Sequence, residues 1–188
     1  VVSWIAHKPD AVNLQILHLE TAASVFEALD IANNMGMPPQ NFVSGDADGN
    51  IGWTIAGKIP LKTNFNAMLP ADWSVKAGWQ GWVQGDDYPR IVNPESGRIW
   101  TANTRVVDGE ALRILGDGGY ALGARARQIR DKLFAKGVFA PADMLAIQND
   151  DRALFLSPWR DLLLGVLSDE AVGDDAQLIE YRRLVEEW

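Results

Sequence analysis

The sequence predicts an α+β fold in which strands and hairpins occupy the first half and helices the second. Short apolar runs separated by turn residues extend over about residues 1–105, together with one helix, whereas apolar residues at helical spacing fill about residues 120–188. This segregation of strands from helices is typical of α+β proteins. With 47% hydrophobic and 22% charged residues, the chain has the composition of a folded protein.

Composition excludes several classes of function. The 188 residues carry 17 Lys and Arg against 25 Asp and Glu, and the resulting pI near 4.7 argues against a nucleic acid as partner. No run of about 18 apolar residues occurs, so no membrane span is predicted. Because the chain has no Cys, it offers no disulfide, no thiolate nucleophile and no Cys-based zinc site.

Three elements are predicted before the first clear turn. Residues 1–6 are short and apolar, as in a buried strand, and residues 12–17 alternate as in a second strand or begin a helix. Residues 22–35 predict an amphipathic helix. The apolar residues expected on one face of this helix are Val25, Phe26, Leu29 and Ala32.

The clearest local signal is a β-hairpin within residues 41–60. Asp48-Gly49 separates two apolar runs, and Gly supplies the positive φ that a tight turn needs. Asp46, Asp48 and Asn50 also have the alternating spacing of a calcium loop, but position 57 is Gly where the closing Glu would stand. The spacing therefore favours the turn over a calcium site.

The next two segments predict a loop and a second hairpin. Residues 61–87 form an aromatic loop, whose Trp73, Trp79 and Trp82 either pack it against the core or stack on a sugar or an aromatic acyl group. Residues 89–101 predict a strand, a turn and a second strand, because the turn residues Asn-Pro and Gly lie between two apolar runs.

Four helices are predicted in the second half. They cover residues 124–136 and begin near Pro141, Pro158 and Asp175. The last 28 residues contain eight acids and two Arg, which indicates a solvated helical face.

No catalytic motif stands out in the residues themselves. The only histidines, His7 and His18, lie eleven positions apart without a third candidate ligand, and no Gly-x-Ser-x-Gly or phosphate-binding loop occurs. Composition and spacing therefore predict an α+β chain without a self-contained active site.

Several segments in order resemble the β-chain interior of the penicillin acylase (penicillin amidase) family of N-terminal-nucleophile hydrolases. The resemblance is strongest between about Gln40 and Gln148. The segments that carry it are Pro39–Val43, Gly45–Trp53, Gly57–Pro60, Pro89–Gly97, Thr101–Asn103 and Gly123–Ile129. It implies that residues 1–188 are a single fragment of a longer β-chain, excised from the family's αββα layered fold.

The resemblance implies hydrolysis of a linear amide C–N bond. In this family the N-terminal Ser of the β-chain attacks the amide carbonyl with its own α-amino group as base, and an Asn helps to hold the oxyanion. Asn103 matches that Asn, and Arg125 matches an Arg that supports it, with Arg127 as the alternative. The nucleophile is expected outside this chain, so the chain alone is expected to be inactive, and the substrate-binding residues stay undefined.

The resemblance also implies the surroundings of the site. It gives a small-molecule acyl-amide as substrate, the remainder of the acylase as partner, and a periplasmic or secreted location. It implies no cofactor or metal in this chain and allows calcium in the full-length protein, although Asp117 does not align with a known ligand. Thr104 stands where many members have a second Asn. The alternative is a non-catalytic binding or scaffold module that uses the Trp-rich loop.

Overall fold

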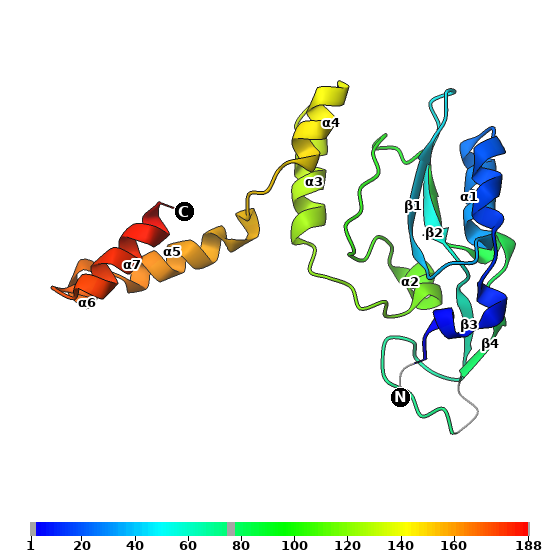
Figure 1. Cartoon of the computed structure of the whole chain (residues 1–188), viewed down its shortest axis with the longest axis horizontal. Helices are drawn as coiled ribbons and strands as arrows, with labels where there is room; N and C mark the ends of the chain where they lie inside the picture. Colours follow the sequence, from blue (N-terminus) through cyan, green and yellow to red (C-terminus); the bar gives the residue numbers. More distant parts are fainter. Residues whose placement is uncertain (1–2, 75–77, 188) are drawn as a thin grey trace. The chain divides into compact units, whose positions relative to one another are not determined.

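The computed structural model describes residues 3–74 and 78–187, and its elements confirm the α+β fold (Figure 1). The chain divides into two compact units, residues 1–126 and 127–188. The described strands all belong to the first unit, which contains α1 (Val25–Asn34), β1 (Gln40–Gly45), β2 (Ile51–Ala56), β3 (Pro60–Thr63), β4 (Gly78–Trp82), β5 (Arg90–Val92) and α2 (Gly109–Leu115). None of the described helices has the length and apolar character needed to cross a bilayer.

The hairpin predicted within residues 41–60 is confirmed. β1 and β2 pair antiparallel from Gln40 opposite Ala56 to Gly45 opposite Ile51, and the turn between them places Gly49 at a φ of +88°. β5 pairs antiparallel with the other edge of β2, so the strand order is β1-β2-β5. β3 and β4 form a separate two-stranded sheet.

α1 covers one face of the three-stranded sheet (Figure 1). Its residues Val25, Leu29 and Ala32 are completely buried. Gly52 of β2 leaves room for them, because a Cβ there would lie 2.6 Å from Val25 Cγ1 and 2.9 Å from Leu29 Cδ1. Phe26 was predicted on the same face, but it is 52% exposed. One residue step turns a helix by about 100°, which carries Phe26 out of the contact with the sheet.

α1 begins three residues later than predicted, at Val25. Ser24 Oγ accepts a hydrogen bond from Glu27 N at 3.2 Å, and Glu27 Oε2 accepts one from Ala23 N at 2.9 Å. The two side chains thus satisfy main-chain amides that the start of a helix leaves without partners. This capping fixes where the helix begins.

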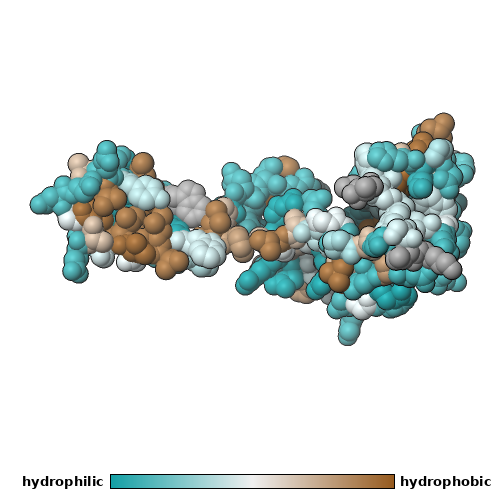
Figure 2. Space-filling view, turned by 90° about the horizontal axis from the view of Figure 1, so that it is seen from below, coloured by the Kyte–Doolittle hydropathy of each residue, from teal (hydrophilic) through white to brown (hydrophobic). Residues whose placement is uncertain are grey.

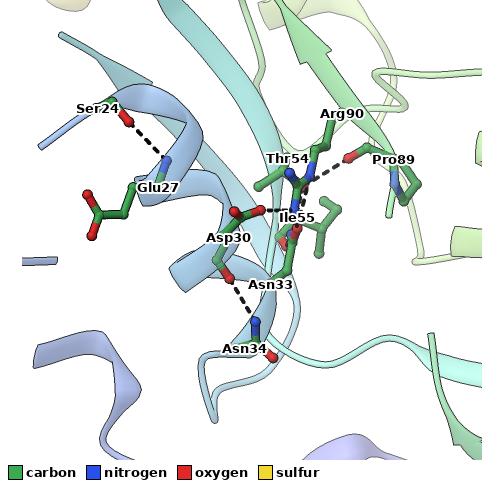
Figure 3. A network of polar contacts seen from close by, with 9 residues as sticks. All are labelled: Ser24, Glu27, Asp30, Asn33, Asn34, Thr54, Ile55, Pro89 and Arg90. Atoms are coloured by element: carbon green, nitrogen blue, oxygen red, sulfur yellow. Dashed lines mark hydrogen bonds and ion pairs between the residues drawn. The ribbon is translucent and has the colours of Figure 1, made fainter. Parts of the chain in front are cut away.

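A buried polar network joins α1 to the sheet (Figure 3). Asn33 Nδ2 donates to Thr54 Oγ1 at 2.9 Å, and Thr54 Oγ1 donates to Pro89 O at 2.9 Å. Arg90 donates through Nε to Asn33 Oδ1 at 3.0 Å and forms an ion pair with Asp30 at 2.7 Å. Because Asn33 and Thr54 are buried, these contacts replace hydrogen bonds that the two side chains would otherwise make to water.

Within the described residues 3–6, the predicted N-terminal strand is not present. Residues 1 and 2 lie outside the described part of the chain, and Ile5–His7 forms a 3₁₀ turn instead of a strand. Of the two alternatives for residues 12–17, the helical one holds, since a 3₁₀ helix runs over Gln15–Thr21. Both segments are held by main-chain bonds between residues three apart, which an apolar pattern does not distinguish from a strand.

Two further segments differ from prediction. Residues 61–87 were predicted as a loop, but they contain most of β3 and all of β4, which pair across an irregularity between Pro60 and Lys62. Residues 98–101 were predicted as a strand, yet they have no strand partner in the described part of the chain and lead directly into a bend. In both cases pairing between distant segments decides the outcome, and local sequence does not report it.

The four helices predicted in the second half are confirmed, and a short fifth one, α6, was not predicted. Their bounds are α3 (Ala124–Phe134), α4 (Pro141–Gln148), α5 (Ser157–Val166), α6 (Asp169–Val172) and α7 (Ala176–Glu186).

Asp150 ties α3 to the segment that follows α4. Its carboxylate accepts a hydrogen bond from Gln128 at 2.7 Å and forms ion pairs with Lys132 at 2.7 Å and Arg152 at 2.8 Å. Hydrogen bonds from Arg152, Lys132 and Gln128 hold the pKa of this carboxyl far below its usual range.

Candidate functional site

Asn103 lies at a bend between the turn that follows β5 and α2. Its φ of +50° is in the left-handed region, which Asn tolerates better than most residues. Its main-chain oxygen accepts a hydrogen bond from Ala121 N at 2.9 Å, which fixes the bend against the loop before α3. The backbone therefore presents an exposed amide side chain from a fixed position.

The structure brings Asn103 and Arg125 together. Arg125, the second residue of α3, donates from Nη2 to Asn103 Oδ1 at 3.0 Å. Since a guanidinium has only donors, the amide must turn its oxygen toward Arg125 and its NH₂ group away from it. Within the described residues, no hydrogen bond engages Nδ2 of Asn103, so that group is available to a ligand.

Arg127 has a different neighbour. Its Nε lies 3.7 Å from Asp131 Oδ2, one helical turn further along α3. Of the two candidates from the sequence, Arg125 is therefore the one that contacts Asn103.

A cavity of about 640 Å³ opens beside Asn103, between the sheet face that α1 leaves uncovered and the segment that contains α2. This volume lies in the range of small-molecule sites. Both apolar and polar groups line it, and Trp53 Nε1 donates to Asn41 Oδ1 at 2.9 Å in its wall. The other side chains with a direct bearing on its chemistry are Thr101, Asn103, Thr104 and Tyr120.

Two lining residues were not singled out from the sequence. Tyr120 donates to Gly116 O at 3.2 Å, and burial raises the pKa of its hydroxyl. Thr101 Oγ1 is buried without a hydrogen-bond partner in the described part of the chain. Thr101 belongs to one of the segments that resemble the family, but no pattern in the sequence marks either residue as lining a cavity, because both reach it through irregular backbone.

The other sequence candidates lie outside this site. His7 packs edge-on against Trp4, with ring centroids 5.4 Å apart. Trp73 contacts Trp79 at 5.5 Å, and Trp82 Nε1 donates to Asp10 at 2.8 Å. The Trp-rich segment thus makes contacts within the first unit, although Trp73 stays 44% exposed and none of the three Trp residues belongs to the buried core.

Asp46 acts as an acceptor for the β1–β2 turn. Its carboxylate receives hydrogen bonds from the main-chain amides of Asp48, Asn50 and Val25 and from the Asn50 side chain. These bonds, chiefly the one from the Asn50 side chain, lower the pKa of Asp46. This use of the carboxylate corresponds to the turn alternative.

Among the described residues, no group of three or more His, Cys, Asp or Glu side chains could hold a metal ion. Asp117, which does not align with a calcium ligand of the family, accepts a hydrogen bond from Gly119 N at 2.9 Å. Its carboxylate thus serves the turn that follows it.

Comparisons with known proteins show to which family the chain is related. The sequence profile of the penicillin amidase family matches residues 1–188. Penicillin acylase 2 proenzyme of Pseudomonas sp. strain SE83 is 34% identical over 158 residues, which cover 84% of this chain and 20% of the proenzyme. Acyl-homoserine lactone acylase QuiP of Pseudomonas aeruginosa is 26% identical over 141 residues, 74% of this chain and 16% of that protein.

A solved structure has a similar fold. The thermostable penicillin G acylase from Alcaligenes faecalis superposes with a TM-score of 0.62 at 20% identity, covering 93% of this chain and 31% of that one. The chain spans about a fifth of the length of the curated relatives that it matches. Because the family profile covers all 188 residues, this chain belongs to the penicillin amidase family.

Proposed function

We propose that this chain is the part of a longer amide hydrolase that supplies the oxyanion-binding amide of Asn103. The single observation that carries the proposal is the contact between Arg125 Nη2 and Asn103 Oδ1 at 3.0 Å. It leaves Nδ2 as a fixed neutral donor beside a ligand-sized cavity. The longer polypeptide that contains these 188 residues is called the full-length protein.

The chemistry requires such a donor. When a hydroxyl attacks an amide carbonyl, the carbonyl oxygen acquires a negative charge, and a donor already in position stabilises it without reorganisation. Arg125 serves as a positioning residue, because it fixes which end of the amide faces the cavity. An exposed Asn without such a contact could rotate its amide freely.

The nucleophile in this proposal is the hydroxyl of an N-terminal Ser outside these 188 residues. Its own α-amino group, with a pKa near 8 in peptides, takes the hydroxyl proton as Oγ bonds to the carbonyl carbon. The tetrahedral intermediate then expels the amine, which receives the proton, and water hydrolyses the acyl-ester. This chain by itself is therefore inactive.

The substrate is an acyl group joined by an amide to an amine, the class to which the names of both relatives refer. The remainder of the acylase is the macromolecular partner of this chain. Family resemblance supports an exported enzyme, periplasmic or secreted.

The test is an assay of the processed full-length protein. Release of free amine is followed from a penicillin and from an N-acyl-homoserine lactone, in the wild type and in Asn103→Ala. Amine release that depends on Asn103 is expected. A correctly processed protein that releases no amine from either substrate, or whose turnover is unaffected by Asn103→Ala, would contradict the proposal.

A further inference from the structure

The pair formed by the helices α5 and α7 leaves an unusually large apolar surface exposed. Of the described apolar residues in the second unit, only Leu133, Leu167 and Val172 are buried. Figure 2 shows apolar side chains gathered over the end of the chain that holds α5 to α7. The exposed large apolar side chains of α5 and α7 are Trp159, Leu162, Val166, Ile179, Tyr181 and Leu184. A folded protein rarely leaves so many together in water.

Part of this surface forms one stripe. On α5, Trp159, Leu162 and Val166 follow one another by three and four positions, so they lie on a single face of the helix, and each is about 60% exposed. On α7, Tyr181 and Leu184 are likewise three positions apart. We call these five residues the apolar stripe.

The two helices run antiparallel, which aligns the two halves of the stripe. Arg160, near the start of α5, donates to the main-chain oxygens of Val185 and Glu186 at the end of α7, at 3.0 and 2.8 Å. With α5 and α7 side by side in this direction, the helical repeat puts the stripe residues of both on the same side of the pair.

The other flank of α7 is polar. Ile179 lies there, one turn before Arg183 and two turns before Glu186. Arg183 forms ion pairs with Glu180 at 2.7 Å and Glu187 at 2.5 Å, and Arg182 pairs with Glu186 at 2.9 Å. Charged groups of this kind stay in water, whereas the stripe has none within it.

We infer that the apolar stripe is an internal docking surface, covered by an apolar face of the same polypeptide outside these 188 residues. The length of chain outside supports this occupant, because the matched region makes up only 20% of the Pseudomonas penicillin acylase 2 proenzyme. In the solved acylase, the fold shared with 93% of this chain makes up 31% of one longer chain. The inference rests on family membership and does not require that the full-length protein be catalytic.

Cysteine labelling tests the inference without disrupting the fold. The chain has no Cys, so Leu162→Cys in the full-length protein gives one new thiol in this region, and peptide mass spectrometry separates it from any elsewhere. Ile179→Cys is the matched control, since Ile179 is a similarly exposed apolar residue on the polar flank. Val166→Cys repeats the measurement on the stripe.

The expected result is face-specific protection. Maleimide should label Leu162→Cys and Val166→Cys about tenfold or more slowly in the native protein than in urea, because only opening of the packed surface exposes them. Ile179→Cys should be labelled at nearly the same rate in both states. Equal labelling of Leu162→Cys and Ile179→Cys in the native protein, fast or slow, would overturn the inference. Protection that disappears on dilution would overturn it as well, because it would assign the stripe to a second copy of the protein. A photoactivatable maleimide on Leu162→Cys that cross-links to residues 1–126 would also overturn it, because it would assign the cover to the first unit of this chain.

Discussion

Asn103 Oδ1 accepts a hydrogen bond from Arg125 Nη2 at 3.0 Å, across 22 positions of sequence. The bend at Asn103 and the start of α3 are thereby joined by a contact that also sets the direction of the amide. An oxyanion donor needs this fixed direction, since a group that must rotate during the reaction loses part of its effect. Removal of the Arg125 side chain should therefore slow the amide hydrolysis that we propose for the full-length protein.

Arg125→Ala should lower kcat by on the order of 10-fold, because the Asn103 amide then loses its fixed orientation. KM should change little, since Arg125 is not proposed to bind substrate. Arg125→Lys should recover part of the loss, because an ammonium group can also donate to Oδ1. Steady-state kinetics of the full-length protein measure all three. Arg127→Ala, which removes the contact with Asp131 instead, is the control and should be close to wild type. Equal effects of Arg125→Ala and Arg127→Ala would remove Arg125 from the site.

Thr54→Val should destabilise the full-length protein by about 1–3 kcal/mol, because Asn33 Nδ2 and Pro89 O each lose the partner that Thr54 Oγ1 provides in a buried position. Urea unfolding followed by Trp fluorescence measures the change. Thr21→Val removes an exposed hydroxyl bonded to His18 O and should change stability by no more than about 0.5 kcal/mol. If both variants unfold at the wild-type midpoint, the buried network does not stabilise the contact between α1 and the sheet.

Gly52→Ala should cost about 1–3 kcal/mol, since the added methyl group would overlap Val25 and Leu29 beneath α1. Gly45→Ala at the end of β1 is the matched control, because its nearest atom would lie at an ordinary 3.7 Å. The temperatures of thermal unfolding distinguish the two variants. A Gly52→Ala protein as stable as Gly45→Ala would mean that α1 packs less closely on β2 than described.

The lowered pKa of Lys62 predicts that the stability of the protein rises with pH. Its Nζ donates to Ile114 O at 2.6 Å at the end of α2, and burial lowers the pKa of Lys62 from 10.5 to about 8. The unfolded chain therefore binds more protons than the folded one between about pH 8 and 10.5, so the free energy of unfolding rises with pH in that window. Measurements are best made up to about pH 9.5, before tyrosines ionise. In Lys62→Met this rise should be smaller than in wild type. An identical pH dependence in both proteins would exclude Lys62 as its source.

The sequence predicted those parts of the fold that depend on local signals. Asp48-Gly49 specifies its turn by itself, and the helix beginning at Ala124 follows from its apolar spacing. The strand β4 was missed, because Trp79 pairs with Lys62 through a register that no local pattern encodes. The strand predicted over residues 1–6 was wrong for the described residues 3–6, since a short apolar run looks the same in a strand and at the start of a 3₁₀ turn.

The candidate site was predictable only through family resemblance. Nothing in the residues around Asn103 distinguishes an oxyanion donor from a turn Asn, because a left-handed φ is compatible with both. The pairing with Arg125 joins segments 22 positions apart, and the cavity appears only once the fold is complete. The burial of the Thr101 hydroxyl was likewise not predictable, since only the folded structure reveals it.

Asn103→Gly in the full-length protein tests the central claim most directly. Glycine adopts a φ of +50° without strain, so this change removes the amide while the backbone bend stays as it is. Asn64→Gly, at another left-handed Asn with a φ of +61°, is the control and should retain wild-type turnover. We predict that Asn103→Gly lowers kcat about 100-fold or more with an unchanged unfolding temperature. A turnover within a few-fold of wild type would contradict the assignment of Asn103 as the oxyanion donor.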